Sequence, residues 1–423
     1  MGVLTRALLI STCLMLAPVA HSSDSVAATP SIEMHPQAET VTAAERSFPA
    51  PQTSLCLGEA CNGRSATTAS STPALMVSAR PSAAPCTNSS GQHAAVPYDI
   101  NGDCTSDLLW MNDQTHQFGW WLLDPMPYAK GAITRHISQI VSVPPGYWIA
   151  ATGDFKNDGL ADLIWTSNSR DLYLWSSNAS GFDSAYIGTY PSGWTLVGAA
   201  DIDGDGYDDL IWEDQSACEF GYWLMKGAQV VNRTTISVAC GYHISFIETA
   251  YDSPNGATPA IYWEGPLTQF ATAPTYLWLP QSQTLNASFY GYVLGDWKFV
   301  AGLLQQNSLG TMEPLTVFDT VASDTSNTLW WATNYAGGAS GLQSLVPGYQ
   351  VVAAGHFTAC NGCPNNQEIL WANGAGKLLV WTLDTSNSQG NPILNDYLGS
   401  EGYSLPDFPA SAGWHVVRPG VQN

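Results

Sequence analysis

Positive charge is scarce in this chain of 423 residues. It has 13 Lys and Arg against 35 Asp and Glu, which gives a formal net charge of -22 at pH 7. Binding to nucleic acid or to an anionic membrane through bulk electrostatics requires clustered cations, and no basic run is present. We therefore expect no nucleic-acid partner.

Long apolar runs are missing beyond the first residues. The segment 1–22 combines Arg6 with an apolar core from Ala7 to Ala20, and so resembles a secretory signal peptide. A membrane anchor and lipidation at Cys13 are the alternatives. No later segment reaches about 18 apolar residues, so we expect no membrane insertion after signal cleavage and a secreted, periplasmic or extracellular protein.

Known catalytic signatures are also absent. The sequence contains no G-x-S-x-G elbow, no H-E-x-x-H, no P-loop and no dinucleotide fingerprint. Its paired carboxylates gather in acidic loops that metal binding already explains. Enzymatic activity is therefore uncertain, and the sequence favours a protein that is not an enzyme.

Glycine, aromatic residues and cysteine are plentiful. With 11% charged residues, 38 Gly and 17 Trp, the composition favours an all-β extracellular protein. Eight cysteines remain beyond Cys13, and in an exported protein disulfides are expected. Closeness in sequence favours Cys56–Cys61, Cys86–Cys104, Cys218–Cys240 and Cys360–Cys363. A zinc site at Cys360 and Cys363 is the alternative.

A repeat organises the chain after residue 90. Residues 23–90 are rich in Ala, Ser, Thr and Pro and are expected to be loosely ordered, whereas 91–423 repeats a phrase of Gly, an aromatic residue, a strand, an acidic loop and a strand ending in Trp. A weak first copy starts at Gly91, and further copies start at Gly146, Gly193, Gly241, Gly295, Gly348 and Gly413. Spacings near 50 residues with four strand-like runs each predict propeller blades. The isolated last copy is predicted to close the array by pairing with N-terminal strands.

The clearest acidic loop follows the first strand of the third copy. Asp201, Asp203, Asp205 and Asp209 stand at relative positions 1, 3, 5 and 9, and the backbone carbonyl of Tyr207 would add an oxygen. Glycines between them allow a tight curl, and this density of hard oxygen ligands suits Ca²⁺. An EF-hand is excluded because its twelfth position needs Glu and here holds a Trp between strand-like flanks. A solvated acidic turn is the alternative.

Two other copies have related loops, here called the first and second loops. The first loop is predicted to bind Ca²⁺ through Asp99, Asn101, Asp103, Thr105 and Asp107. In the second loop the predicted ligands are Asp154, Asp158 and Asp162, but Lys156 replaces one ligand with a cation, and Asn157 is a substitute only if the loop shifts. The later copies lack an acidic set, and in the sixth His356 stands where Asp would. We expect the ions to be structural.

These motifs resemble a known family. The pattern D-x-D-G-D-G-x-x-D-L before a strand ending in Trp resembles the FG-GAP / VCBS repeats of integrin-alpha-like β-propellers, over about residues 91 to 420. The resemblance implies an all-β propeller of four-stranded blades, seven-bladed favoured and six possible, with calcium loops between the first and second strands of some blades.

Tryptophans recur in the predicted third strands. Blade packing is the favoured interpretation and sugar stacking is the alternative for Trp120, Trp121, Trp175, Trp223, Trp278, Trp330, Trp331 and Trp381. The predicted function is a monomeric, secreted, calcium-binding module for glycans or for cell-surface or extracellular proteins. The alternatives are a carbohydrate-active enzyme, such as a polysaccharide lyase or hydrolase, and a structural adhesion protein.

Overall fold

The computed structural model describes residues 96–123, 135–178, 181–248, 259–280, 285, 287–294, 297–306, 312–320, 328–333, 340–344, 349–357, 368–374, 376–384, 393–396 and 412–417. All of them belong to one compact unit, Glu33–Asn423. The segments 1–22 and 23–90 lie outside the described residues.

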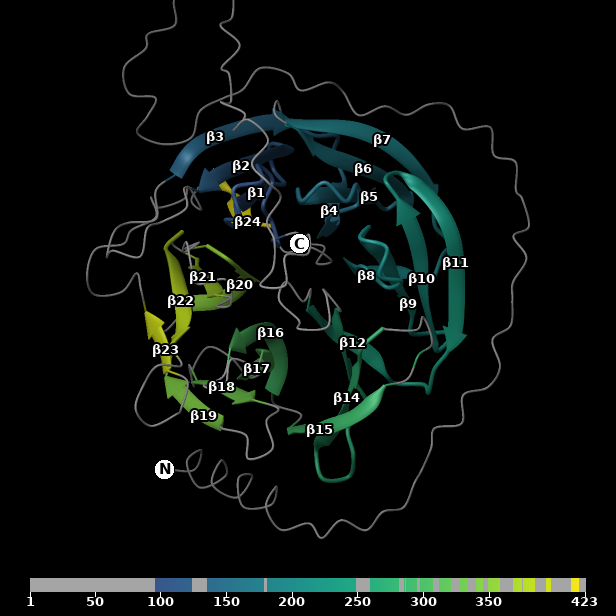
Figure 1. Ribbon diagram of the computed structural model, residues 1–423, viewed down its shortest axis with the longest axis vertical. Coiled ribbons are helices and arrows are strands. Elements are labelled where there is room, and N and C mark those ends of the chain that lie inside the picture. The colour runs from purple at the N-terminus through teal and green to yellow at the C-terminus, as the bar shows by residue number, and fades with distance from the viewer. Residues whose placement is uncertain are drawn as a thin grey trace, which may run out of the picture. The chain divides into compact units, whose positions relative to one another are not determined.

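These residues form six four-stranded antiparallel sheets, and most of their strands are labelled in Figure 1. The first sheet has the order β24 (Trp414–Val416), β1 (Leu108–Asn112), β2 (Gln117–Leu123) and β3 (Arg135–Ser142). The second runs through β4 (Tyr147–Gly153), β5 (Asp162–Ser167), β6 (Asp171–Asn178) and β7 (Gly181–Thr189). The third runs through β8 (Thr195–Ala200), β9 (Asp209–Asp214), β10 (Glu219–Lys226) and β11 (Gln229–Ser237).

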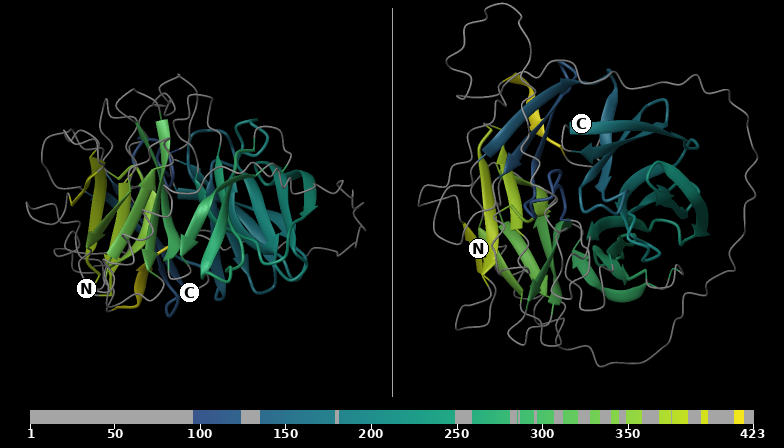
Figure 2. Two further views of the ribbon diagram at one scale, coloured as in Figure 1. Left: turned by 90° about the horizontal axis from the view of Figure 1, so that it is seen from below. Right: turned by 45° about the horizontal axis from the view of Figure 1, so that its top comes forward.

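The remaining three sheets have the same consecutive order. The fourth contains β12 (His243–Glu248), β13 (Ala260–Glu264), β14 (Thr272–Trp278) and β15 (Ser288–Leu294). The fifth contains β16 (Trp297–Gln306), β17 (Met312–Thr320), β18 (Thr328–Thr333) and β19 (Ser340–Ser344). The sixth contains β20 (Tyr349–Gly355), β21 (Glu368–Asn373), β22 (Leu378–Asp384) and β23 (Ile393–Asp396). The all-β prediction and the four-stranded unit are confirmed, and Figure 2 shows the strands of each sheet from two further sides.

The first sheet differs because its first strand comes from the other end of the chain. β24 pairs with β1 so that Trp414 lies opposite Asn112 and Val416 opposite Trp110. This confirms the predicted closing strand. The predicted strand of the Gly91 copy is wrong over its described part, since 96–100 form turns and bends. β24 provides the ladder bonds that this segment would have supplied.

Burial in the third sheet is greatest in its two middle strands and lowest in its outer strand. Every residue of β9 is buried, whereas β11 contains only half-buried and exposed residues. The apolar LIW run of β9 is therefore covered on both faces, as expected for a strand between neighbouring sheets, and Asn232 and Arg233 of β11 are exposed.

Tryptophan pairs fill the space between the sheets. Ring centroids lie 4.6 Å apart in Trp110–Trp121, 4.9 Å in Trp165–Trp175 and 4.7 Å in Trp212–Trp223. The packing interpretation is confirmed, and sugar stacking is wrong, for the buried residues Trp120, Trp121, Trp175, Trp223 and Trp278. The side chains of Trp330, Trp331 and Trp381 lie outside the description.

Each sheet contacts the next, and the sixth contacts the first. One core cluster joins Trp110 and Trp121 of the first sheet to Leu370 and Val380 of the sixth. Others join the first to the second, the second to the third and the third to the fourth sheet. The described sheets match the six-blade alternative, and the blade number of the whole chain stays a prediction.

One predicted disulfide is present, and two other predicted cysteine pairs lie wholly outside the described residues. Cys218 is bonded to Cys240 with Cα atoms 4.9 Å apart. Cys104 is disulfide-bonded, and its predicted partner Cys86 lies outside the described residues, as do the pairs Cys56–Cys61 and Cys360–Cys363. Within the described ranges, no helix has the length and apolarity to cross a membrane.

Candidate metal centre

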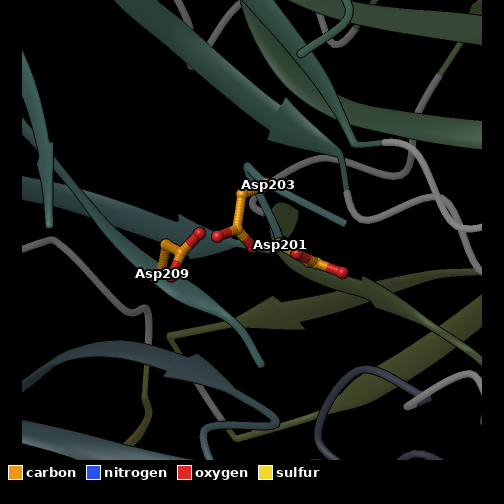
Figure 3. Close-up of side chains that lie close together, drawn as sticks. All are labelled: Asp201, Asp203 and Asp209. Atoms are coloured by element: carbon orange, nitrogen blue, oxygen red, sulfur yellow. The ribbon is translucent and has the colours of Figure 1, made fainter. Parts of the chain in front are cut away.

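The third loop, between β8 and β9, brings three carboxylates together. One oxygen from each of Asp201, Asp203 and Asp209 lies within 4.8 Å of the others. Figure 3 shows these three side chains close together. Asp201 and Asp203 come from the loop itself, and Asp209 is the first residue of β9. These are three of the predicted ligands.

Backbone amides hold the first of these carboxylates in place. Asp201 accepts hydrogen bonds from the N–H of Gly204 at 2.7 Å and the N–H of Gly206 at 2.9 Å. Both glycines have positive φ angles, +78° and +89°, which L side chains rarely adopt. The two left-handed residues curl the loop around the Asp201 carboxylate.

Asp209 ties the loop to the third strand of the sheet. Its buried carboxylate accepts the N–H of Ile202 at 2.9 Å and the N–H of Met225, in β10, at 2.8 Å. Burial raises the pKa of Asp209 to about 8, with the nearby charges of Asp203 and Asp201 acting in the same direction. Burial also raises the pKa of Asp201. A bound cation would relieve the cost of ionising these clustered groups.

Asp205 and Tyr207 both lie near the Lys226 ammonium. The Asp205 carboxylate is 3.4 Å from the Lys226 ammonium and is not one of the three clustered acids. It also accepts the N–H of Tyr207 at 3.1 Å, and the Lys226 ammonium lies 5.5 Å from the Tyr207 ring centroid. The predicted roles of Asp205 and of the Tyr207 carbonyl stay predictions.

The first loop repeats the same internal bonding. Asp99 accepts the N–H of Gly102 at 2.7 Å and of Cys104 at 2.8 Å, which are again the fourth and sixth loop positions. Asp107 accepts the N–H of Ile100 at 3.0 Å and that of Leu123, in β2, at 2.9 Å. Burial raises the pKa of Asp99 to about 7 and that of Asp107 well above its ordinary value.

Hydrogen bonds also connect the other predicted ligands of the first loop. The Asn101 amide donates to Asp103 at 3.3 Å, and Asp103 accepts the N–H of Thr105 at 2.9 Å. The Thr105 hydroxyl is buried and has no hydrogen-bond partner. Buried carboxylates, an amide oxygen and an unpaired hydroxyl fit the oxygen-rich shell of Ca²⁺.

The second loop contains its own cation. The Lys156 ammonium lies 2.9 Å from a carboxylate oxygen of Asp158, and the charges of Asp158 and Asp162 raise the pKa of the lysine against its burial. Asp162 accepts the N–H of Ser177 at 2.8 Å, while its other oxygen is buried without a hydrogen-bond partner. Burial raises the pKa of Asp162 to about 8.

This loop keeps the register of the others. Asp154 accepts the N–H of Asp158 at 3.0 Å and that of Gly159 at 2.8 Å, as Asp99 and Asp201 do with the matching residues. Asn157 has a positive φ of 53° and donates to the Asp205 carbonyl of the next loop at 3.4 Å. The loop therefore does not shift Asn157 into the ligand position. With Lys156 at that position, the second loop fits a metal ion less well than the other two.

Neighbouring loops are joined by a repeated contact that the sequence pattern did not reveal. The N–H of the eighth residue of each loop donates to the carbonyl of the first residue of the preceding loop: Asp208 to Asp154 at 2.9 Å, Ala161 to Asp99 at 2.7 Å, and Ser106 to His356 at 2.7 Å. Where the eighth residue has a polar side chain, a second hydrogen bond runs in the opposite direction. The Asp208 carboxylate accepts the Asp154 N–H and the Ser106 hydroxyl accepts the His356 N–H, both at 2.7 Å.

His356 completes this series as a neutral residue. It is buried, and burial lowers its pKa to about 4. The uncharged His356, at the first position of the sixth copy, therefore connects this copy to the first loop through backbone hydrogen bonds, without the acidic residues of the other loops. This agrees with the predicted absence of acidic ligands in that copy.

Comparison with known proteins places one segment in a family. Residues 154–212 match the FG-GAP-like repeat, a span that begins at Asp154 in the second loop and ends at Trp212 in β9. This segment is therefore an FG-GAP-like repeat, as the motif predicted. No curated protein sequence matches the chain.

Several solved structures are similar at low sequence identity. The SapL1 lectin in complex with alpha methyl fucoside is 13% identical with a TM-score of 0.36, covering 62% of this chain and 83% of its own. AofleA from Arthrobotrys oligospora is 10% identical with a TM-score of 0.35, covering 65% and 87%. The fucose-specific lectin from Aleuria aurantia is 14% identical with a TM-score of 0.33, covering 62% and 92%. Because these scores are below 0.5, the ligands of these lectins carry no weight for this chain.

Proposed function

We propose that the protein is a secreted, calcium-binding β-propeller that acts as a binding module for glycans or extracellular proteins. The observation that carries the calcium proposal is the meeting of Asp201, Asp203 and Asp209 oxygens within 4.8 Å. Three carboxylates at this separation repel one another, and burial further penalises their charged forms. A divalent cation supplies the compensating charge.

The bound ions would have a structural role in this proposal. Asp209 and Asp107 connect their loops to β10 and β2, and the first and eighth loop residues connect neighbouring loops. An ion held by the same carboxylates would fix both sets of contacts at once. Calcium would therefore stabilise the arrangement of the first, second and third sheets.

The binding role is supported by exposed apolar side chains. Large exposed hydrophobic residues in the described ranges concentrate in residues 267–292, in or near the fourth sheet. Patches of this kind on a soluble protein mark interaction sites more often than they serve stability. With a net charge of -22, the chain would favour partners that are not polyanions.

Calcium binding is tested on the full chain expressed with its N-terminal segment and purified from the medium. We expect isothermal titration to detect bound calcium and thermal unfolding to shift upward by several degrees relative to EDTA. A protein that binds no calcium and unfolds identically in calcium and EDTA would overturn the calcium proposal.

The binding role needs a separate measurement. A glycan array and a panel of extracellular proteins are probed with the same preparation in calcium and in EDTA. Binding that is lost in EDTA together with the thermal shift would support a calcium-stabilised module. A folded, calcium-loaded protein that binds neither class of ligand would overturn the binding proposal while leaving calcium binding intact.

A further inference from the structure

Exposed aromatic residues gather on the fourth sheet. Of the large hydrophobic residues with exposed side chains in the described ranges, two lie on the second and third sheets, Tyr186 and Val231. The others belong to the fourth sheet and its connections: Leu267, Phe270, Leu279, Phe289 and Tyr292. The aromatic members Phe289 and Tyr292 are 54% and 57% exposed and lie on the outer strand β15, labelled in Figure 1.

An irregularity in the sheet brings these two aromatic residues to one face. In the pairing of β14 with β15, Tyr276 lies opposite Phe289 and Pro274 opposite Tyr292, with a register shift between Thr275 and Tyr276. Three positions separate Phe289 from Tyr292, which in a regular strand would place them on opposite faces. The extra residue of the bulge restores them to the face of Tyr276.

The rings on this face form a continuous series. Ring centroids lie 5.1 Å apart for Phe289 and Tyr292, 5.5 Å for Tyr276 and Phe289, and 5.7 Å for Tyr242 and Tyr276. We call Tyr242, Tyr276, Phe289 and Tyr292 the aromatic face. Tyr242 and Tyr276 are partly buried against the core shared by the third and fourth sheets, so the exposed end of the series stands on a packed base.

A glycine makes room for the inner end of the series. A Cβ atom at Gly265 would lie 2.6 Å from a ring carbon of Tyr242 and 2.8 Å from the Pro274 ring, distances that real side chains do not reach. Only glycine therefore lets the Tyr242 ring cross the end of β13 toward Tyr276.

The aromatic face includes three phenol groups. Burial raises the pKa of Tyr242, and the neighbouring Tyr276 and Tyr292 act in the same direction. The hydroxyls are neutral groups that both donate and accept hydrogen bonds. The face thus combines exposed aromatic rings with the neutral hydroxyls of its tyrosines.

We infer that the aromatic face binds an uncharged sugar ring of a glycan, an inference that rests on the proposed binding function and assigns its site. A sugar ring offers polarised C–H groups to the negative face of an aromatic ring and hydroxyls around its edge, which matches stacking on Phe289 and Tyr292 beside the tyrosine hydroxyls. A globular protein partner would need roughly 20 to 30 residues on each side, far more than this face offers. The net charge of -22 disfavours sulfated or sialylated glycans.

The test compares variants on an array that contains neutral, sialylated and sulfated glycans, followed by titration with the neutral glycan that binds best. We expect Phe289→Ala and Tyr292→Ala to weaken binding by about tenfold or more, as loss of an aromatic anchor does. Tyr292→Phe keeps the ring and should weaken binding less. Tyr186→Ala removes an exposed aromatic residue from the second sheet and is the matched control. Because Phe289 and Tyr292 are exposed, their variants should keep the wild-type unfolding temperature.

The possible outcomes test the proposed binding site separately from the proposed binding function. Neutral-glycan binding that is lost in Phe289→Ala and Tyr292→Ala but kept in Tyr186→Ala supports the inference. Binding that all variants keep overturns the site and leaves the proposed function standing. Binding only of charged glycans overturns the uncharged class. If the folded, calcium-loaded protein binds no glycan on the array, the inference is overturned. The proposed binding function then depends on binding to an extracellular protein.

Discussion

Asp201 is held by the backbone of its own loop and stands in the acidic cluster of the third loop. The Gly204 and Gly206 amides stabilise its charge, whereas burial and the charges of Asp203 and Asp205 oppose it. The Gly204 N–H and the Gly206 N–H donate to different oxygens of Asp201, so an amide at this position would keep an acceptor for one of them and lose the other bond, together with the charge that a cation needs. A change at this residue therefore affects the loop in both conditions and affects metal binding only when calcium is present.

Asp201→Asn should remove most of the calcium-dependent stabilisation, in addition to a smaller loss in both calcium and EDTA from the one backbone hydrogen bond that the amide cannot accept. At calcium a hundredfold above the dissociation constant, that stabilisation is about 2.7 kcal/mol per ion. Denaturant unfolding in calcium and in EDTA measures it. Asp113→Asn, a variant of an exposed acid beside β1, is the control and should keep the calcium increment. Equal losses in calcium and EDTA would contradict a metal role for Asp201.

Lys156 offers the converse change. Its ammonium pairs with Asp158 in a loop whose backbone bonds match those of the first and third loops. Lys156→Asp would replace the internal cation by a carboxylate at the third loop position and create the spacing of the third loop.

We expect Lys156→Asp to bind one more calcium ion per chain than the wild type, counted by metal analysis after equilibrium dialysis. In EDTA the variant should be less stable because the acids lose their cationic partner. Lys377→Asp, at an exposed position in the sixth sheet, is the control and should leave the count unchanged. An unchanged count in Lys156→Asp would show that the lysine is not what keeps the metal out.

At the scale of elements, hydrogen bonds connect each loop to the preceding loop, and glycine residues make space for two of these connections. A Cβ atom at Gly153 would lie 2.5 Å from a carboxylate oxygen of Asp208, and one at Gly355 would lie 2.5 Å from the Ser106 hydroxyl. Both glycines are the last residues of first strands, β4 and β20. In the first loop the connection involves Ala161, and there the residue before Asp99 is Tyr98, not glycine.

Gly153→Ala should destabilise the fold by roughly 1 to 3 kcal/mol, because the methyl group displaces the Asp208 carboxylate from the Asp154 N–H. Gly374→Ala, where a Cβ meets nothing within 4 Å, is the matched control and should change stability by less than about 0.5 kcal/mol. Urea unfolding in constant calcium measures both. Similar effects at the two positions would contradict this connection.

At the scale of the molecule, neighbouring sheets are connected by buried polar groups in addition to their shared apolar cores. The buried Glu213 carboxylate of β9 accepts the N–H of Ile244 in β12, across the boundary between the third and fourth sheets. Burial raises the pKa of Glu213 to about 7, above its ordinary value of 4.5. The folded protein therefore holds the proton more tightly than the unfolded chain.

This difference gives stability a defined pH dependence. The contribution is fully present below about pH 4.5 and is lost as the pH rises through about 7, because the unfolded chain releases the proton first. Glu213→Gln keeps an acceptor for Ile244 and cannot ionise, so its stability should decline less than that of the wild type across this window. Unfolding midpoints measured from about pH 4.5 to about pH 8 at constant calcium compare the two. Parallel pH profiles would contradict this role for Glu213.

The sequence by itself determined the repeat, the strands and the loop chemistry. Glycine and an aromatic residue at the start of the first strands, and a Trp in the second strand of every sheet except the fifth, mark local backbone and burial requirements that recur along the chain. The acids at positions 1, 3 and 9 of the third loop are close in sequence, so a local turn suffices to bring them together. The closing strand β24 was also predictable, because a lone first strand leaves an unpaired edge.

Only the tertiary structure decided what depends on residues far apart in the chain. Asp205 pairs with Lys226, the eighth residue of each loop reaches the preceding loop, and the third-strand tryptophans whose side chains are described are buried. The exposed aromatic face likewise depends on one bulge that turns Phe289 and Tyr292 to the same side. Periodicity gives the alternation within a strand, but register and the packing of one sheet on the next decide which side chains remain exposed.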